Sequence, residues 1–128
     1  MSPKKSPQKI EINSDKEKIF NSMIENSPFM ILRNKKDATI TYVNKAIENF
    51  FGIQKKDVIG KKWLSDISKE QKEEIKNYLK EASEKLTTFQ HNVSYTLKNN
   101  EQKIIQWITQ PLLDDNGNFL DELQAIGI

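Results

Sequence analysis

The chain has 128 residues, which is enough for one domain with a hydrophobic core but too few for two comfortable ones. It contains no cysteine, so disulfides, thiolate metal sites, cysteine nucleophiles and cysteine-linked chromophores are excluded within this chain. The net charge of +2 arises in the first 18 residues, and lysines and glutamates alternate in the rest. Such alternation is typical of solvated helix faces, so we expect no nucleic-acid partner.

The sequence shows no sign of membrane insertion. No apolar run approaches the roughly 20 residues that a membrane-spanning helix needs, and the first residues lack the apolar segment of a secretory signal. We therefore expect this segment to be cytoplasmic and to make no membrane contact itself. This expectation leaves open a membrane anchor elsewhere in a parent protein. Residues 1–13 include Pro3 and Pro7 and show no apolar period, which predicts a flexible leader.

A short amphipathic helix is predicted over residues 14–26. Ser14 and Glu17 have the spacing of a capping box, and the apolar residues that follow fall on one helical face. These apolar residues are Ile19, Phe20, Met23 and Ile24. We place the folded domain at residues 14–128 and its core at residues 28–128.

A hairpin and a capped corner are predicted next. Residues 29–32 and 39–43 are apolar or β-branched runs separated by a polar turn, which indicates two paired strands. Asn44 then has the position of a helix N-cap, and Gly52 has the position of a left-handed C-cap. The buried face of the helix between them is predicted to consist of Ala46, Ile47, Phe50 and Phe51.

The second half contains one helix and three strands. Residues 53–67 are irregular with brief helical character. Ser68 and Gln71 have capping-box spacing, and the helix that they begin, which reaches Leu86, is expected to be the longest. Residues 87–97 alternate strictly between apolar and polar, which predicts a strand. Turns at residues 99–100 and 115–118 delimit two further strands, 102–113 and 119–128.

This order of elements predicts an α+β fold with a five-stranded antiparallel sheet and its helices on one face. Five segments in this order also resemble the PAS domain of sensory proteins over about residues 18–128. They are IENSPF, ITYVNKAIENFFG, DVIGKKW, the helix before TTFQHNV, and WITQPLLDDNGNFLDELQAIGI. Each segment is short and tolerates many substitutions, so none identifies the family by itself. The five together, in this order and spacing, are specific for the family.

The resemblance implies a PAS fold and a sensor or protein-interaction module rather than an enzyme. Such modules usually belong to larger signalling proteins, such as histidine kinases and diguanylate cyclases. Family members commonly continue into a coiled-coil linker just beyond the position of Ile128, so we expect an excised module that lacks its output linker and effector. They often dimerise through the leading helix and the outer sheet face, which suggests a homodimer contact at Ile19, Phe20, Met23 and Ile24.

The resemblance also narrows the cofactors. Family members bind haem, flavin or small metabolites between the sheet and the helices, and some bind nothing. Cysteine-linked flavin is excluded because the chain has no cysteine. Haem-binding members generally supply a histidine from the long helix, and residues 69–86 contain none, so we expect no haem. The expected occupant is an unidentified small molecule or none.

Twelve residues are candidates for lining a pocket: Tyr42, Asn44, Ile47, Phe50, Phe51, Trp63, Tyr78, Leu79, His91, Val93, Tyr95 and Trp107. Their aromatic members suit a small-molecule site, although core packing, or a dimer surface for Trp107, explains them equally well. In PAS domains the asparagine at the Asn44 position most often braces the corner, which favours a structural role. His91, the only histidine, is either a pH-sensitive ligand contact or, as a lone histidine more often is, a half-buried residue bonded to a neighbour.

Three functions remain open. The leading one is a sensory PAS module that binds a small ligand, or senses without one, and biases a downstream effector. The second is a cofactor-free dimerisation module. The third is a small stand-alone enzyme, which would need a nucleophile with a base or an acid–base pair. Asp57 and Asp66 are the only carboxylates in the irregular middle, residues 53–67, and surface or capping roles are favoured for both. We therefore predict no catalytic residue and no metal ligand.

Overall fold

The computed structural model describes the backbone of residues 5–128 and the side chains of residues 15–128. The helices in this range are α1 (Lys5–Glu25), α2 (Lys45–Phe51), α3 (Lys55–Val58) and α4 (Lys69–Lys85). The strands are β1 (Met30–Asn34), β2 (Ile40–Val43), β3 (Phe89–Thr96), β4 (Gln102–Leu113) and β5 (Phe119–Gly127). None of these helices combines the length and the apolar character that crossing a membrane requires.

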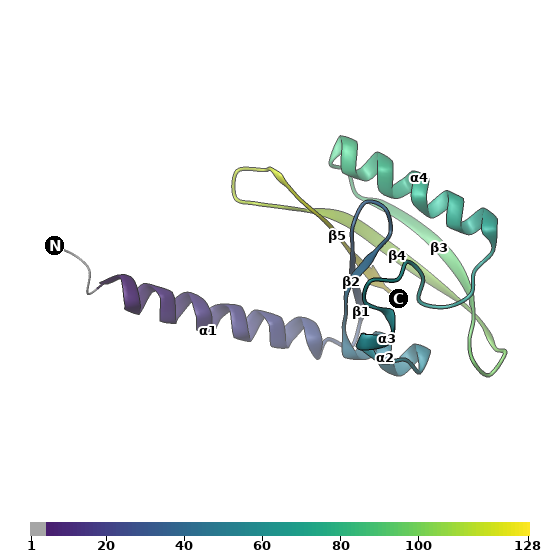
Figure 1. Cartoon of the computed structure of the whole chain (residues 1–128), viewed down its shortest axis with the longest axis horizontal. Coiled ribbons are helices and arrows are strands. Elements are labelled where there is room, and N and C mark those ends of the chain that lie inside the picture. Colours follow the sequence, from purple (N-terminus) through teal and green to yellow (C-terminus); the bar gives the residue numbers. More distant parts are fainter. Residues whose placement is uncertain (1–4) are drawn as a thin grey trace.

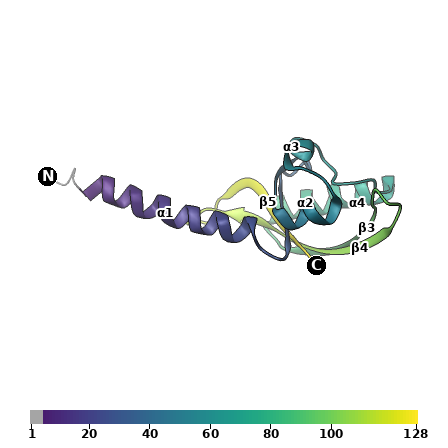
Figure 2. The same ribbon diagram turned by 90° about the horizontal axis from the view of Figure 1, so that it is seen from below.

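The strands form one antiparallel sheet in the order β2-β1-β5-β4-β3, so the last strand of the chain lies at the centre. Helices α2, α3 and α4 lie on one face of this sheet, whereas α1 projects away from the domain (Figures 1 and 2). The predicted α+β fold with a five-stranded antiparallel sheet is confirmed.

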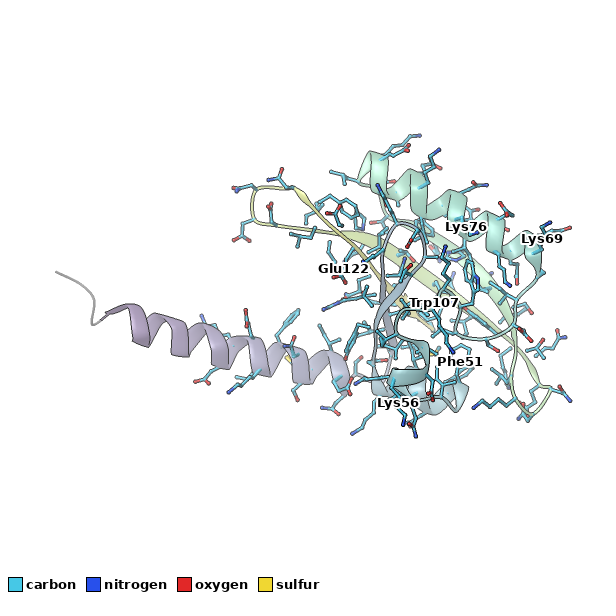
Figure 3. The ribbon with its side chains drawn as sticks, in the orientation of Figure 1. Phe51, Lys56, Lys69, Lys76, Trp107 and Glu122 are labelled. Carbon is cyan, nitrogen blue, oxygen red and sulfur yellow. The ribbon has the colours of Figure 1, made fainter. Side chains whose placement is uncertain are left out.

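Strand register places one row of residues across four strands. His91 of β3 lies opposite Trp107 of β4, Trp107 lies opposite Gly127 of β5, and Gly127 lies opposite Met30 of β1. Trp107 and Phe51, the latter from α2, both belong to the main core between the sheet and the helices (Figure 3). The other buried members of this core are Met30, Ile40, Val43, Ile47, Val58, Leu64, Val93, Tyr95, Ile105 and Ala125.

Asn44 holds the corner at which β2 turns into α2. Its side-chain oxygen accepts hydrogen bonds from the backbone N–H groups of Ile31 (3.0 Å) and Ile47 (3.3 Å). Its amide nitrogen donates to the carbonyl oxygens of Ile24 (3.0 Å) and Phe29 (2.9 Å). Since Asn44 is fully buried, these bonds replace the water that its polar atoms have lost. The predicted N-cap and the bracing role of Asn44 are both confirmed.

The end of α2 follows the prediction except at one residue. Gly52 adopts the left-handed conformation (φ 65°, ψ 40°), and the N–H of Ile53 donates to the carbonyl of Glu48 at 3.1 Å, as in a Schellman cap. Ile47 and Phe51 are buried as predicted, but Phe50 is 38% exposed. The predicted burial of Phe50 is therefore wrong, because a seven-residue helix turns only one face towards the core.

The N-terminal helix differs most from the prediction. It begins at Lys5 rather than Ser14, so the flexible leader predicted over residues 1–13 is wrong from residue 5 onward, and residues 1–4 lie outside the described range. Pro7 falls in the first turn, where the missing N–H costs no helical hydrogen bond. Extending a formed helix then adds one hydrogen bond for each residue.

Helix α4 starts as predicted but is not the longest helix. The hydroxyl oxygen of Ser68 accepts from the N–H of Gln71 at 3.1 Å, and Leu86 ends the helix in a left-handed conformation (φ 55°). The expectation that this helix is the longest is wrong, because α1 has 21 residues and α4 has 17. The capping residues therefore predicted the start of α4 correctly, whereas the capping-box spacing at Ser14 did not predict where α1 begins.

Asn44→Ala should lower the free energy of unfolding by about 3–5 kcal/mol, because it strands several buried backbone groups at once. Urea unfolding monitored by circular dichroism measures this loss. Asn92→Ala, on an exposed position of β3, is the matched control and should change stability by less than about 0.5 kcal/mol. Equal stability of the two variants would contradict the role assigned to Asn44.

Candidate functional site

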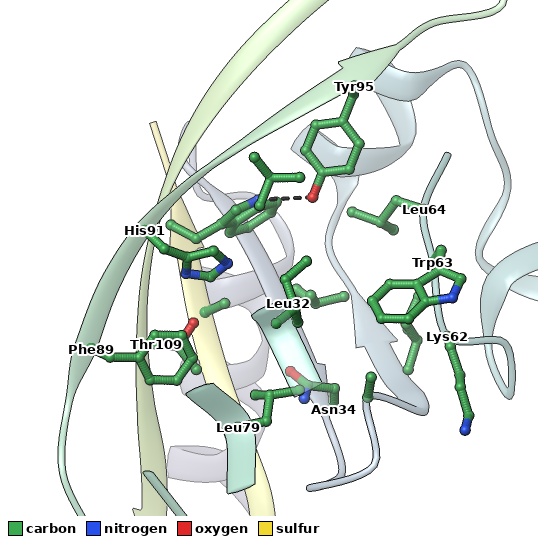
Figure 4. Close-up of a pocket in the computed structure, with 16 residues that line it drawn as sticks. Leu32, Asn34, Lys62, Trp63, Leu64, Leu79, Phe89, His91, Tyr95 and Thr109 are labelled. Atoms are coloured by element: carbon green, nitrogen blue, oxygen red, sulfur yellow. Dashed lines mark hydrogen bonds between the residues drawn. The ribbon is translucent and has the colours of Figure 1, made fainter. Parts of the chain in front are cut away.

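A cavity of about 50 Å³ lies between the sheet, α4 and the segment that precedes α4 (Figure 4). A cavity needs about 10–15 Å³ of such volume to hold one water molecule, so this cavity has room for about three to five groups of that size. Its lining is mostly apolar and comes from segments far apart in the sequence. The lining residues are Leu32, Asn34, Ala38, Ile40, Lys62, Trp63, Leu64, Ile75, Leu79, Phe89, His91, Val93, Tyr95, Trp107, Thr109 and Ala125.

The cavity brings together half of the twelve candidate pocket residues. The six that line it are Trp63, Leu79, His91, Val93, Tyr95 and Trp107. The other six, Tyr42, Asn44, Ile47, Phe50, Phe51 and Tyr78, do not. Ile47 and Phe51 pack in the core, Asn44 braces the corner, and Phe50 is partly exposed on the outer side of α2. These six candidate residues therefore do not line this cavity.

Tyr42 lies at the end of α1, away from the cavity. Its hydroxyl donates to Glu25 at 2.6 Å, and Glu25 also forms an ion pair with Lys55. Burial alone would raise the pKa of the Glu25 carboxyl, but hydrogen bonds from Lys55 and Tyr42 lower this pKa overall. The cluster joins the end of α1 to β2 and α3. Tyr42 therefore has a structural partner instead of a place at the cavity.

His91 contributes an unsatisfied polar atom to the cavity wall. Its Nδ1 is buried and has no hydrogen-bond partner among the described residues. The ring packs against Phe89 and Tyr78, with ring centroids 5.2 Å and 5.5 Å away. Burial lowers the pKa of His91, and the charge of Glu74 offsets only part of this effect. The interpretation that His91 is bonded to a neighbour is wrong for this nitrogen.

Tyr95 and Trp107 form a hydrogen-bonded pair on the same wall. The indole Nε1 of Trp107 donates to the hydroxyl oxygen of Tyr95 at 2.9 Å, and both side chains are buried (Figure 4). Burial strongly raises the pKa of Tyr95, which keeps the hydroxyl protonated. No hydrogen bond within residues 15–128 uses the proton of this hydroxyl. The proton is therefore available to an acceptor inside the cavity.

Two buried polar residues of the lining were missed from the sequence. Thr109 shares the inward face of β4 with Trp107, so the alternation of that strand contained the signal. Asn34 is buried at the start of a polar turn, and its amide donates to the carbonyl of Lys35 at 2.8 Å. Nothing in the local sequence of that turn marks Asn34 as buried, because a polar run is the usual pattern of an exposed loop.

Carboxylates and histidine were the residues considered for catalysis and metal binding. Among the described residues, no group of three or more His, Asp or Glu side chains is placed to hold a metal ion. Asp57 and Asp66 are exposed, and neither lines the cavity. What the cavity provides instead is apolar walls with a few inward polar groups, which is how small-molecule sites are usually built.

The stability of the native protein should fall as the pH drops below about 6.5, because His91 has a lower pKa when folded than when unfolded. Between these two pKa values the unfolded state binds more protons, so the free energy of unfolding rises with pH. Urea unfolding near pH 7.5 and near pH 5.5 measures the difference. His91→Gln should remove this part of the pH dependence, and an unchanged dependence would assign it to other groups. Glu25, Asp37 and Asp114 have pKa values lowered from 4.5 or less and act in a more acidic range.

Comparison with solved structures shows the same fold at low sequence identity. The PAS domain of an HTR-like protein from Haloarcula marismortui has a TM-score of 0.68 and 18% identity, and the match covers 98% of each chain. The PAS domain of BvgS from Bordetella pertussis has a TM-score of 0.68 and 18% identity over 89% of this chain and 85% of that one. VqmA bound to DPO has a TM-score of 0.71 and 15% identity over 88% of this chain and 56% of that one.

A search of curated proteins found no match. The family model that describes the PAS fold, however, matches residues 24–125, which run from the end of α1 into the last third of the central strand β5. This match includes the corner at Asn44 and the whole cavity lining. The chain therefore belongs to the PAS family.

Proposed function

We propose that this chain is the cytoplasmic sensory module of a larger signalling protein, of the histidine kinase or diguanylate cyclase type. In this proposal it binds a small molecule in the cavity and relays a conformational change to a downstream effector. The supporting observation is the buried and unpartnered Nδ1 of His91 on the cavity wall. A buried polar atom without a partner costs free energy, and a ligand that supplies the missing hydrogen bond recovers it.

Trp107 offers a route from the cavity to the end of β5. A Cβ atom at Gly127 would lie 2.8 Å from Cζ3 of Trp107, so the indole ring packs directly on the backbone of Gly127. The same indole donates a hydrogen bond to Tyr95 in the cavity wall. A ligand that moves Tyr95 or Trp107 therefore acts on the C-terminal end of β5. It shifts the conformational equilibrium only as far as it binds two arrangements unequally.

The comparisons agree with this proposal. One solved relative is a domain of the sensory box sensor histidine kinase/response regulator from Geobacter sulfurreducens, and VqmA was solved with DPO bound. Another VqmA structure concerns DNA binding by that protein, and the match covers 49% of its chain. We propose no nucleic-acid contact for this chain, because acidic residues accompany its lysines throughout residues 19–128. We also propose a non-covalent occupant other than haem, because α4 offers no histidine.

Native mass spectrometry of protein purified from cells without added ligand tests this function. We expect a reproducible extra mass that is lost on mild denaturation, and its removal should shift the backbone NMR signals of residues 125–127 in β5. A protein whose mass equals that of the bare chain in repeated preparations would contradict ligand sensing and would favour the cofactor-free alternative.

A dimerisation module is the second candidate, and an exposed apolar stripe on α1 favours it. Ile19, Phe20 and Met23 are 63%, 59% and 66% exposed. Ile24, which was included in the predicted contact, is buried, and its carbonyl bonds to Asn44. Ile24 therefore belongs to the domain rather than to a partner surface. The outer face of the sheet also leaves Ile104 exposed by 70%, which is consistent with a second covered region in a dimer.

Phe20→Glu should convert a dimer into a monomer, because it places a charge in the centre of the apolar stripe. Analytical ultracentrifugation measures the mass in solution, and unchanged circular dichroism confirms the fold. Asn21→Glu adds the same charge to the neighbouring exposed position and should leave the dimer intact. If both variants form dimers of equal stability, the apolar stripe on α1 is not part of the dimer interface.

A further inference from the structure

The last turn of α1 is joined to the domain by a backbone contact and by a side-chain contact. The carbonyl oxygen of Ile24 accepts from the side chain of Asn44 at 3.0 Å. The carboxylate of Glu25 accepts from the hydroxyl of Tyr42 at 2.6 Å and pairs with the ammonium group of Lys55. A second point of attachment restricts rotation about the first. The Glu25 contact therefore restrains the direction in which α1 leaves the domain (Figure 1).

Tyr42 and Lys55 are held in place by groups other than Glu25. The backbone N–H of Lys55 donates to the carboxylate of Glu48 in α2 at 3.0 Å. The guanidinium of Arg33 lies over the ring of Tyr42, with its Cζ 5.5 Å from the ring centroid, and its Nε donates to a side chain of the central strand β5 at 3.0 Å. We therefore expect both donors to keep their places when Glu25 is absent.

The surroundings of Glu25 favour an ionised carboxylate. Burial alone would raise its pKa, but the bonds from Lys55 and Tyr42 and the charges of Lys55 and Lys45 lower this pKa overall. The side chains of Lys55 and Glu25 are 35% and 29% exposed, so salt screens their attraction only in part. Bonds from a hydroxyl and an ammonium group to a carboxylate are charge-assisted, and such bonds are stronger than those between neutral groups.

A groove of about 350 Å³ lies beside this carboxylate. The residues that line it are Asn21, Ile24, Glu25, Arg33, Tyr42 and Lys55. All of these except Ile24 are at least partly exposed, so the groove opens to solvent. A small anion is therefore able to reach the same two donors from outside.

We propose that Tyr42 and Lys55 form a binding site for carboxylates, and that Glu25 is its resident ligand. Helix α1 is then attached by a contact that another carboxylate is able to replace, and the replacement releases the restraint on its direction. This site is separate from the cavity between the sheet and α4, because none of the groove residues lines that cavity.

Acetate tests this proposal in Glu25→Ala, which leaves the two donors without their carboxylate. We expect acetate to shift the backbone NMR signals of Tyr42 and Lys55 saturably in this variant, at the roughly millimolar concentrations that suit a ligand of four non-hydrogen atoms. The native protein should need at least about tenfold more acetate, because the tethered Glu25 competes at a high effective concentration.

Two further variants and a neutral probe identify the site. Glu25→Ala combined with Lys55→Met should lose most of the response to acetate. Asn21→Ala removes a side chain from the same groove but no carboxylate, so it should respond as the native protein does. Acetamide has the size of acetate without its charge and should not cause the shift in Glu25→Ala.

Residual dipolar couplings of the backbone amides in residues 17–23 report the direction of α1 relative to the sheet. They are measured in the Phe20→Glu background, so that no partner chain restrains the helix. The couplings should decrease in Glu25→Ala and stay unchanged in Asn21→Ala. Saturating acetate should not restore them, because acetate fills the site without being connected to α1.

Circular dichroism checks that each variant is folded. Glu25→Gln, which keeps an oxygen acceptor for Tyr42 but no charge, takes the place of Glu25→Ala if the latter does not fold. Its affinity for acetate should exceed that of the native protein, because a neutral amide competes less well than a carboxylate.

The absence of a saturable response to acetate in the folded Glu25 variant would overturn the proposal. Equal affinity in the native protein would overturn it too, as would an undiminished response in the variant that also carries Lys55→Met. Couplings of residues 17–23 that stay the same without the Glu25 carboxylate would contradict its role in restraining α1.

Discussion

The N-terminal half of the domain depends on the four hydrogen bonds of one buried side chain, Asn44. They join the end of α1 at Ile24, the start of the hairpin at Phe29 and Ile31, and the first turn of α2 at Ile47. An amide is suited to this place because it offers donors and an acceptor together. With no water to replace a lost bond, these three segments hold one arrangement, and α2 is directed over the sheet.

A second set of contacts reinforces the same junction. Glu25 binds Tyr42 and Lys55, so the last turn of α1 is attached to β2 and α3 by side chains as well as through Asn44. Earlier in the helix, Ile19, Phe20 and Met23 have most of their surface exposed. Among the described side chains, those that attach α1 to the domain therefore lie in its last turn.

Trp107, in the cavity wall, packs on the backbone of β5 because Gly127 has no side chain. The indole ring occupies the space above the backbone of β5, and its N–H is satisfied by Tyr95. His91, in the same cross-strand row, receives no comparable partner for Nδ1 among the described residues. Native proteins seldom leave a buried polar atom without a hydrogen bond, so the unpaired Nδ1 of His91 is the feature of this wall that needs an explanation.

Features governed by neighbours in the sequence could be predicted, whereas features governed by packing could not. The caps at Asn44, Gly52 and Ser68 depend on residues three or four positions away, and all three were predicted. Helix α1 was predicted to begin too late, because once a helix has formed its extension depends less on a local start signal. Phe50 and Phe51 have the same chemistry, and only the packed orientation of α2 exposes one and buries the other.

The sequence by itself determined the order of elements and the capped corner, because short-range backbone preferences and alternating patterns specify them. The resemblance of five segments, in order, also indicated the PAS family. Only the tertiary structure decided which residues enclose the cavity. Thr109, Asn34 and Leu79 meet His91 there because strand order and helix placement bring distant segments together. Whether Nδ1 of His91 finds a partner depends on every neighbour in that space at once, and no local pattern in the chain encodes it.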